Sequence, residues 1–86
     1  MEIALKNLGT INQNKVVIGD LVLYFSYETI VGFSCGTGLK VSKNIWSKTT
    51  GKLLNYLEPN KKNRLEYNDF IKELDKVLKP QLQIII

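Results

Sequence analysis

The first half of the chain alternates apolar and polar positions with the two-residue period of β-strands. Residues 2–6 place Ile3 and Leu5 on one face, and residues 8–11 extend or repeat that strand. Further short segments of this kind lie at residues 16–18, 21–26, 29–35 and 39–43. Turn-forming residues separate them, such as Asn-Gln-Asn-Lys at 12–15 and Gly-Thr-Gly at 36–38. The pattern therefore predicts an antiparallel meander over residues 2–44.

Alternation also assigns side chains to the two faces of the predicted sheet. Tyr24 and Phe25 point to opposite faces of one strand, and Val31, Phe33 and Cys35 share a face of the next. Cys35 on such a face is interpreted as a small buried hydrophobic residue and not as a redox centre.

After residue 46 the apolar period lengthens to that of a helix. Leu53, Leu54 and Leu57 predict a short helix over 48–57, which Pro59 stops. Residues 66–79 carry the strongest helical pattern, and Pro80 is expected to end it. Its apolar stripe consists of Tyr67, Phe70, Ile71, Leu74, Val77 and Leu78. The predicted fold class is α+β, an antiparallel β-meander of three to five strands with one short helix and one C-terminal amphipathic helix packed on one face.

The end of the chain, residues 81–86, is apolar and contains Leu82, Ile84, Ile85 and Ile86. Two interpretations stay open. The segment is either an edge strand or flap packed on the core, or an intermolecular contact formed by strand addition or dimerisation.

Length and composition describe a single folded domain, residues 1–86, with 44% hydrophobic and 23% charged residues. The longest apolar stretch, Leu21–Phe25, is far shorter than the roughly 18 residues that a membrane span needs. The N-terminus lacks the basic and then apolar pattern of a signal peptide. We therefore expect no membrane partner and a cytoplasmic location, with which the single cysteine agrees.

The residue inventory argues against an enzyme. The absence of histidine excludes Ser-His-Asp and Cys-His pairs, and one cysteine cannot build a zinc site of four Cys and His ligands. The glycines at 36 and 38 lack the third glycine of a dinucleotide-binding loop, and Leu53 stands where a phosphate-binding loop needs Ser or Thr. A Ser-Lys pair is the one catalytic arrangement left open. We expect no catalytic activity, no cofactor and no metal.

Charge is concentrated in the middle of the chain. Residues 38–64 hold seven cations and one acid, a net charge of +6, whereas residues 1–37 and 65–86 each carry −1. Such a block faces nucleic acid, an acidic protein surface or only solvent. The predicted partner-binding residues are Lys40, Lys43, Trp46, Lys48, Lys52, Lys61, Lys62 and Arg64.

Several of these positions have a structural and a functional interpretation. Trp46 either closes one end of the core or anchors an interface. Residues 49–52 (Thr-Thr-Gly-Lys) either cap a helix or present backbone N–H groups to a phosphate or carboxylate. Residues 61–64 (Lys-Lys-Asn-Arg) form a polar loop and are the best candidate for an exposed contact site. Phe25 and Phe33 are expected in the core, although the aromatic residues around the meander could also stack bases.

Two segments carry a resemblance to a known family. Residues 24–29 (YFSYET) and 46–52 (WSKTTGK) resemble small uncharacterised proteins of tailed bacteriophages, in which a YFSYET-VGF strand pair precedes N-WS-TTGK-LN. The resemblance covers roughly residues 3–78, but Leu53 replaces a histidine that family members usually have. It implies an origin in a phage or prophage and expression in the bacterial cytoplasm, and it implies no particular activity.

These observations favour a small phage-encoded, non-enzymatic interaction protein that binds a host protein and inhibits or redirects it. A defence or nucleic-acid-processing protein would be such a target, which makes the chain a candidate counter-defence inhibitor in host takeover. The first alternative is a basic nucleic-acid-binding module that uses these lysines with Tyr24 or Trp46. The second is a minor structural protein that forms a homo-oligomer through residues 82–86.

Overall fold

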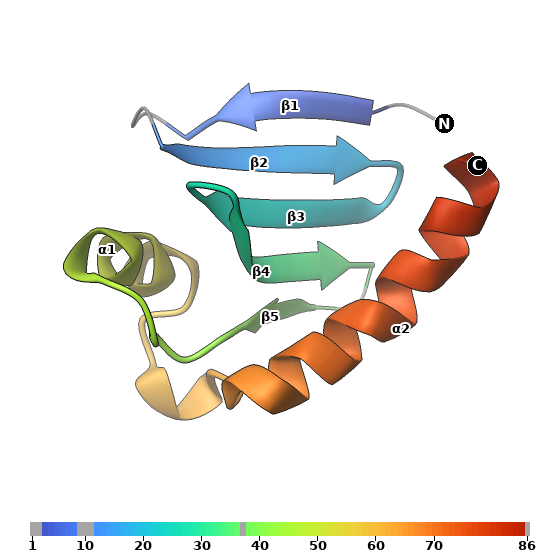
Figure 1. Cartoon of the computed structure of the whole chain (residues 1–86). Helices are drawn as coiled ribbons and strands as arrows, with labels where there is room; N and C mark the ends of the chain where they lie inside the picture. Colours follow the sequence, from blue (N-terminus) through green and yellow to red (C-terminus); the bar gives the residue numbers. More distant parts are fainter. Residues whose placement is uncertain (1–2, 9–11, 37, 86) are drawn as a thin grey trace.

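The computed structural model contains one antiparallel sheet of five strands in chain order, followed by two helices (Figure 1). It describes residues 3–8, 12–36 and 38–85, and in the last helix the side chains up to residue 78. The elements are β1 (Ile3–Asn7), β2 (Gln13–Ile18), β3 (Leu21–Ser26), β4 (Thr29–Cys35), β5 (Leu39–Val41), α1 (Lys48–Leu57), the 3₁₀ helix η1 (Lys61–Asn63) and α2 (Tyr67–Ile85). The predicted α+β class is confirmed. Of the predicted strand segment 8–11, residues 9–11 lie outside the described residues.

Consecutive strands pair because the turns between them are short. Gly19 and Asp20 connect β2 to β3, and Tyr27 and Glu28 connect β3 to β4. Gly19 and Tyr27 have positive φ values of 59° and 56°, which suit the twist of tight hairpins. The Tyr27 N–H also donates to the Asn12 carbonyl oxygen at 2.6 Å, which ties this turn to the start of β2.

A β-bulge in β4 changes the predicted assignment of side chains to faces. Tyr24 pairs with Gly32 and Phe25 pairs with Ile30, so Val31 is an extra residue in β4. Val31 and Phe33 were expected to share a face, but Phe33 packs with α2 and Val31 packs with α1. That prediction is wrong because the inserted residue reverses the alternation at this point.

The core beneath α2 contains six buried residues, Ile18, Leu21, Leu23, Phe33, Phe70 and Leu74. The Phe33 and Phe70 rings have centroids 5.6 Å apart and are tilted by 50°. Cys35 and Phe25 are half-buried against this core. The amphipathic stripe of α2 therefore covers the sheet face for which its sequence pattern is suited.

The second core lies beneath α1, on the opposite face of the sheet, and consists of Val31, Val41, Leu53 and Leu54. Successive side chains of a strand point to opposite faces of the sheet. In β5, Lys40 contacts α2 and the next residue, Val41, packs against α1, so the two helices lie on opposite faces. A buried hydrogen bond of 2.8 Å joins the Ser26 and Thr50 hydroxyls and connects β3 to α1. The short helix is found at the predicted residues 48–57, with Ser47 as its N-cap.

The last helix is longer than predicted. It was expected over 66–79 with a stop at Pro80, but α2 extends to Ile85. A proline removes one N–H donor from a helix, and no glycine follows it here to terminate the remaining turns. Residues 81–85 are consequently helical and do not form the expected edge strand or flap, and Ile86 lies outside the described residues. No helix in the described part of the chain is long and apolar enough to cross a membrane.

Gly32→Ala is expected to lower the free energy of unfolding by about 1–3 kcal/mol, the usual range for overpacking. A Cβ at Gly32 would lie 3.2 Å from Leu57 Cδ1 and 3.4 Å from the Lys40 carbonyl oxygen, so these close neighbours would have to shift by a few tenths of an ångström. Gly38→Ala is the matched control, because a Cβ there meets nothing within 4 Å. Urea denaturation followed by circular dichroism measures both, and equal losses would contradict close packing at Gly32.

Candidate functional site

Five cations from three separate segments line one open pocket of about 640 Å³. They are Lys43, Lys48, Lys52, Lys61 and Arg64, and are named the basic cluster below. Asn44, Gly51 and Asn55 complete the lining, and no carboxylate belongs to it. The pocket therefore combines concave shape with charge of a single sign.

Helix α1 supplies half of this lining from one stripe. Lys48, Gly51, Lys52 and Asn55 recur at three- and four-residue intervals and so lie on the same side of the helix. The buried residues Leu53 and Leu54 fix the rotation of α1 by packing on the sheet. The stripe then faces away from that core.

Gly51 lets the pocket wall approach α1. A Cβ at this position would lie 3.0 Å from the side-chain nitrogen of Asn44. Asn44 is itself fixed, because its Nδ2 donates to the Ser47 carbonyl at 3.0 Å and its Oδ1 accepts from the Trp46 N–H at 2.9 Å. Although glycine weakens a helix, here it makes space for a side chain that lines the pocket.

Arg64 is the buried member of the basic cluster, with 6% of its surface exposed. Its Nη2 donates to Asn55 Oδ1 at 2.7 Å and to the Glu58 carbonyl oxygen at 2.9 Å, and its Nε donates to that same carbonyl at 3.0 Å. All these acceptors are neutral. The positive charge of the guanidinium is thus desolvated without a carboxylate beside it, which favours an anion in the pocket.

A short bridge between β5 and the segment after η1 brings Arg64 and Lys61 close to Lys43. The Leu65 N–H donates to the Val41 carbonyl, and the Lys43 N–H donates to the Leu65 carbonyl, each at 2.8 Å. Residues distant in the chain are thereby held at one site by backbone hydrogen bonds.

The charge of the basic cluster is largely unneutralised. Lys43 forms an ion pair with Glu66. Among the described residues, Lys48, Lys52, Lys61 and Arg64 form none. Like charges gathered in a concave site raise the local concentration of anions.

Three predicted site residues lie elsewhere. Lys40 is on the α2 side of the sheet, where it binds Glu73. Trp46 is half-buried beside the α1 core and packs edge-on against Tyr67, with ring centroids 5.7 Å apart. Lys62 is exposed on η1 and does not line the pocket. The sequence left open whether the basic residues 40–64 form one continuous surface, and the structure places the Lys40 side chain on the opposite face of the sheet from the basic cluster.

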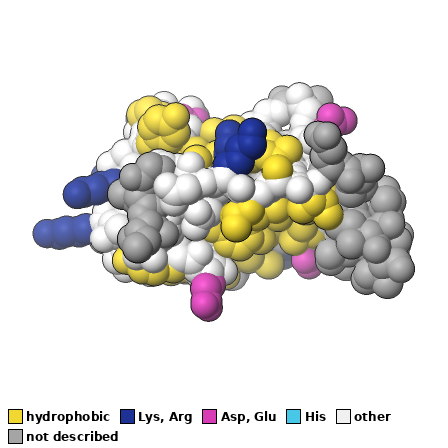
Figure 2. Space-filling view, turned by 90° about the horizontal axis from the view of Figure 1, so that it is seen from above, with side chains coloured by type: hydrophobic (Ala, Val, Ile, Leu, Met, Phe, Trp, Pro, Cys, Tyr) yellow, Lys and Arg dark blue, Asp and Glu magenta, His cyan; other side chains and the backbone are white. Residues whose placement is uncertain are grey.

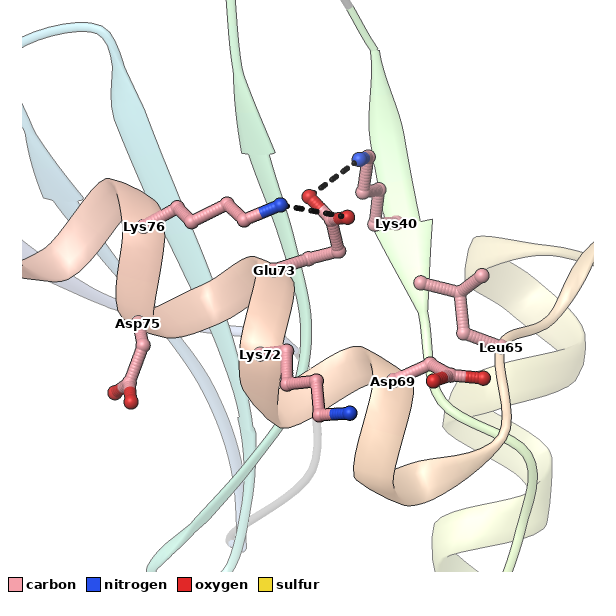
Figure 3. Close-up of a pocket in the computed structure, with 7 residues that line it drawn as sticks. All are labelled: Lys40, Leu65, Asp69, Lys72, Glu73, Asp75 and Lys76. Atoms are coloured by element: carbon pink, nitrogen blue, oxygen red, sulfur yellow. Dashed lines mark hydrogen bonds and ion pairs between the residues drawn. The ribbon is translucent and has the colours of Figure 1, made fainter.

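A second pocket, between β5 and α2, has a different character (Figure 3). Three acids and three lysines line it, and Glu73 binds Lys40 at 3.1 Å and Lys76 at 3.5 Å. The hydrogen bond from Lys40 and the charge of that lysine hold the pKa of Glu73 below its usual range. The ion pair between Lys40 and Glu73 connects β5 to α2. Because the acids and lysines of the lining are equal in number, this pocket has no excess charge for a ligand.

The lowered pKa of Glu73 predicts a pH-dependent contribution to stability. A carboxylate whose pKa is depressed by folding stabilises the folded chain above the unfolded pKa and loses this effect as the pH falls through the folded value. Glu73→Gln should lower the urea midpoint at pH 7, and the difference from the wild type should shrink from about pH 5 downward. Asp75→Asn is the control, because Asp75 points away from Glu73 and forms no ion pair among the described residues (Figure 3). A difference for Glu73→Gln that is constant with pH would contradict the ion pair.

Sequence reasoning missed three residues at or beside the site. Asn44 and Asn55 line the basic pocket, and the spacing of Lys48, Gly51, Lys52 and Asn55 was a signal for a common helix face. Tyr56 is 78% exposed and lines an adjoining pocket of about 390 Å³, which also includes Lys52. Over the described ranges, no group of three or more His, Cys, Asp or Glu side chains could hold a metal ion.

The chain belongs to a protein family of unknown function, DUF8033, whose family model matches residues 2–73. The expected membership of an uncharacterised family is thereby confirmed. The match includes every residue of the basic cluster. No curated protein and no solved structure matches the chain.

Proposed function

We propose that this protein is a small, non-enzymatic interaction protein that binds an acidic surface of a partner protein through the basic cluster. One observation carries the proposal: four cations without a carboxylate partner among the described residues converge with Lys43 on one open pocket. The proposed partner is a protein of a bacterial host, which the bound chain inhibits or redirects. The origin in a phage is supported by the resemblance of residues 24–29 and 46–52 to phage proteins.

The members of the basic cluster have different roles in this binding. Arg64 is fixed by three hydrogen bonds to neutral oxygens, and its Nη1 makes none with the described residues. It can therefore donate to an incoming carboxylate with little loss of side-chain freedom. Lys48, Lys52 and Lys61 are exposed and adapt to the shape of the partner. Such an interface depends on electrostatic attraction and should weaken as salt is added.

Binding is favoured over catalysis by the chemistry available around the pocket. Lysine, arginine and asparagine side chains line it, and the chain contains no histidine to act as a base near neutral pH. The one cysteine, Cys35, packs half-buried against the α2 core, away from this lining. These residues can hold an anion, but they offer no activated nucleophile.

A nucleic acid is the second candidate partner, and Tyr56 is the observation that favours it. Its exposed ring beside Lys52 could stack on a base while the lysines contact phosphates. The acidic protein is preferred because the basic pocket itself has no aromatic lining. Phe33 is buried and Trp46 packs against Tyr67, so these predicted stacking residues are engaged elsewhere.

The test is a tagged pulldown from bacterial lysate, with one half treated with nuclease. The wild-type chain should retain a host protein in both halves, and Lys48→Glu/Lys52→Glu should lose it. The affinity for the isolated partner should fall at least about tenfold, which corresponds to roughly 1.4 kcal/mol. Anisotropy measurements at two salt concentrations would give this value.

The matched control is Lys62→Glu/Lys72→Glu, which changes the net charge equally outside the pocket. If both double variants lose the partner to the same extent, net charge and not the basic cluster drives binding, and the proposal fails. If nuclease removes the bound material, and single-stranded oligonucleotides bind with an affinity that Tyr56→Ala weakens, the nucleic-acid function replaces it.

A further inference from the structure

Strand β1 is an edge of the sheet, and its outer backbone groups have no neighbouring strand among the described residues. The Leu8 N–H donates to the Gln13 carbonyl at 2.8 Å, in register with the β1–β2 pairs. Along an antiparallel strand, every second residue directs its N–H and C=O groups toward the neighbouring strand. Lys6 and Ala4, which lie two and four residues before Leu8, therefore also direct these groups toward β2. The N–H and C=O groups of Ile3 and Leu5 therefore point away from the sheet.

The same two residues expose apolar side chains. Ile3 is 57% exposed and Leu5 is 71% exposed. Figure 2 looks onto this edge of the sheet and shows hydrophobic side chains gathered at the centre of the surface. Natural edge strands are usually protected by charges, prolines or bulges. β1 has one such charge, Lys6, but the middle residue of the strand is an exposed leucine.

The charged side chains on the three strands nearest this edge have one sign. β1, β2 and β3 contain two charged residues, and both are lysines, Lys6 and Lys15. These lysines are cross-strand partners, an arrangement that destabilises a sheet because the like charges repel. Neither forms an ion pair with the described part of the chain. An acid placed between or beside them would remove this repulsion.

We propose that β1 accepts an extended segment of a partner protein as a sixth strand, and that this segment alternates apolar and acidic residues. Its backbone pairs with the outward groups of Ile3 and Leu5. Its apolar side chains lie beside Ile3 and Leu5, and its acidic side chains lie on the opposite face beside Lys6, whose cross-strand neighbour is Lys15. The two-residue period of a strand requires this alternation.

Charge complementarity selects this occupant over a second copy of the chain. Pairing β1 with itself would bring a second Lys6 and a second Lys15 to an edge whose two lysines form no ion pair within the described ranges. An acidic strand instead neutralises them. This inference does not depend on the basic cluster, since β1 and the β5 strand that leads to α1 are opposite edges of the sheet (Figure 1).

The probe is the capped heptapeptide Glu-Val-Glu-Val-Glu-Val-Glu, titrated into the full-length ¹⁵N-labelled chain. Amide shifts should concentrate on residues 3–7 and Lys15, and the N–H groups of Ile3 and Leu5 should become protected from hydrogen exchange. Leu5→Pro removes an outward N–H without breaking the β1–β2 pairing and should weaken binding at least about tenfold. Because that variant could unfold, Lys6→Glu/Lys15→Glu is measured as well. It should lose the acidic peptide and gain binding of Lys-Val-Lys-Val-Lys-Val-Lys.

Three outcomes would overturn the inference. The first is the absence of shifts at β1 at millimolar peptide. The second is a set of shifts confined to the basic cluster, which would leave the proposed function intact. The third is a dimer in light scattering of the chain alone that Leu5→Pro dissociates, because a second copy would then occupy the edge. Lys48→Glu is the control and should leave the β1 shifts unchanged.

Discussion

The extra residue in β4 is the constraint on which the rest of the structure depends. Val31 is inserted between Ile30 and Gly32, so one strand sends apolar side chains to both faces within four residues. Without the bulge, Val31 and Phe33 would lie on the same face, and α1 would lose its central contact with the sheet. A chain of 86 residues has little apolar surface to divide between two cores, and sharing β4 makes both feasible. Gly32 completes the arrangement, because its missing Cβ lets Leu57 approach the sheet.

Packing of the α1 core also determines where the charge lies. With Leu53 and Leu54 buried, the stripe that contains Lys48 and Lys52 faces outward. The backbone hydrogen bonds between Leu65 and the end of β5 then bring η1 to the side of the molecule on which this stripe lies. The basic cluster therefore results from apolar contacts and backbone hydrogen bonds. Cations that repel one another are held together by parts of the chain that bear no charge.

Periodicity in the sequence was sufficient for the fold class, the meander and the helix at 48–57, because each depends on local patterns of burial. It failed at Val31, since a bulge interrupts alternation without any change in residue type, and at Pro80, where the helix continues beyond a residue that usually ends one. At the candidate site, the basic segment of the sequence pointed to all five members of the basic cluster. It did not separate them from Lys40, because the partner of that lysine, Glu73, is 33 residues away in the chain. The burial of Arg64 likewise depends on the Asn55 side chain and the Glu58 carbonyl, which no local pattern indicates.

The distribution of acids distinguishes the two sides of the molecule more clearly than the distribution of lysines. A composition rich in lysine would place cations on every surface, and by itself would say nothing about partners. Near α2, Glu66 and Glu73 neutralise lysines of the segment after β4. Glu58 instead contributes its backbone carbonyl to Arg64, and its carboxylate does not line the basic pocket. The same contrast applies to Lys6 and Lys15, which face each other on strands without any acid. Selective neutralisation thus leaves two positive surfaces. Apart from the pair of Lys43 with Glu66, their cations form no ion pair within the described chain, and an acidic partner would supply the missing counter-charge at both.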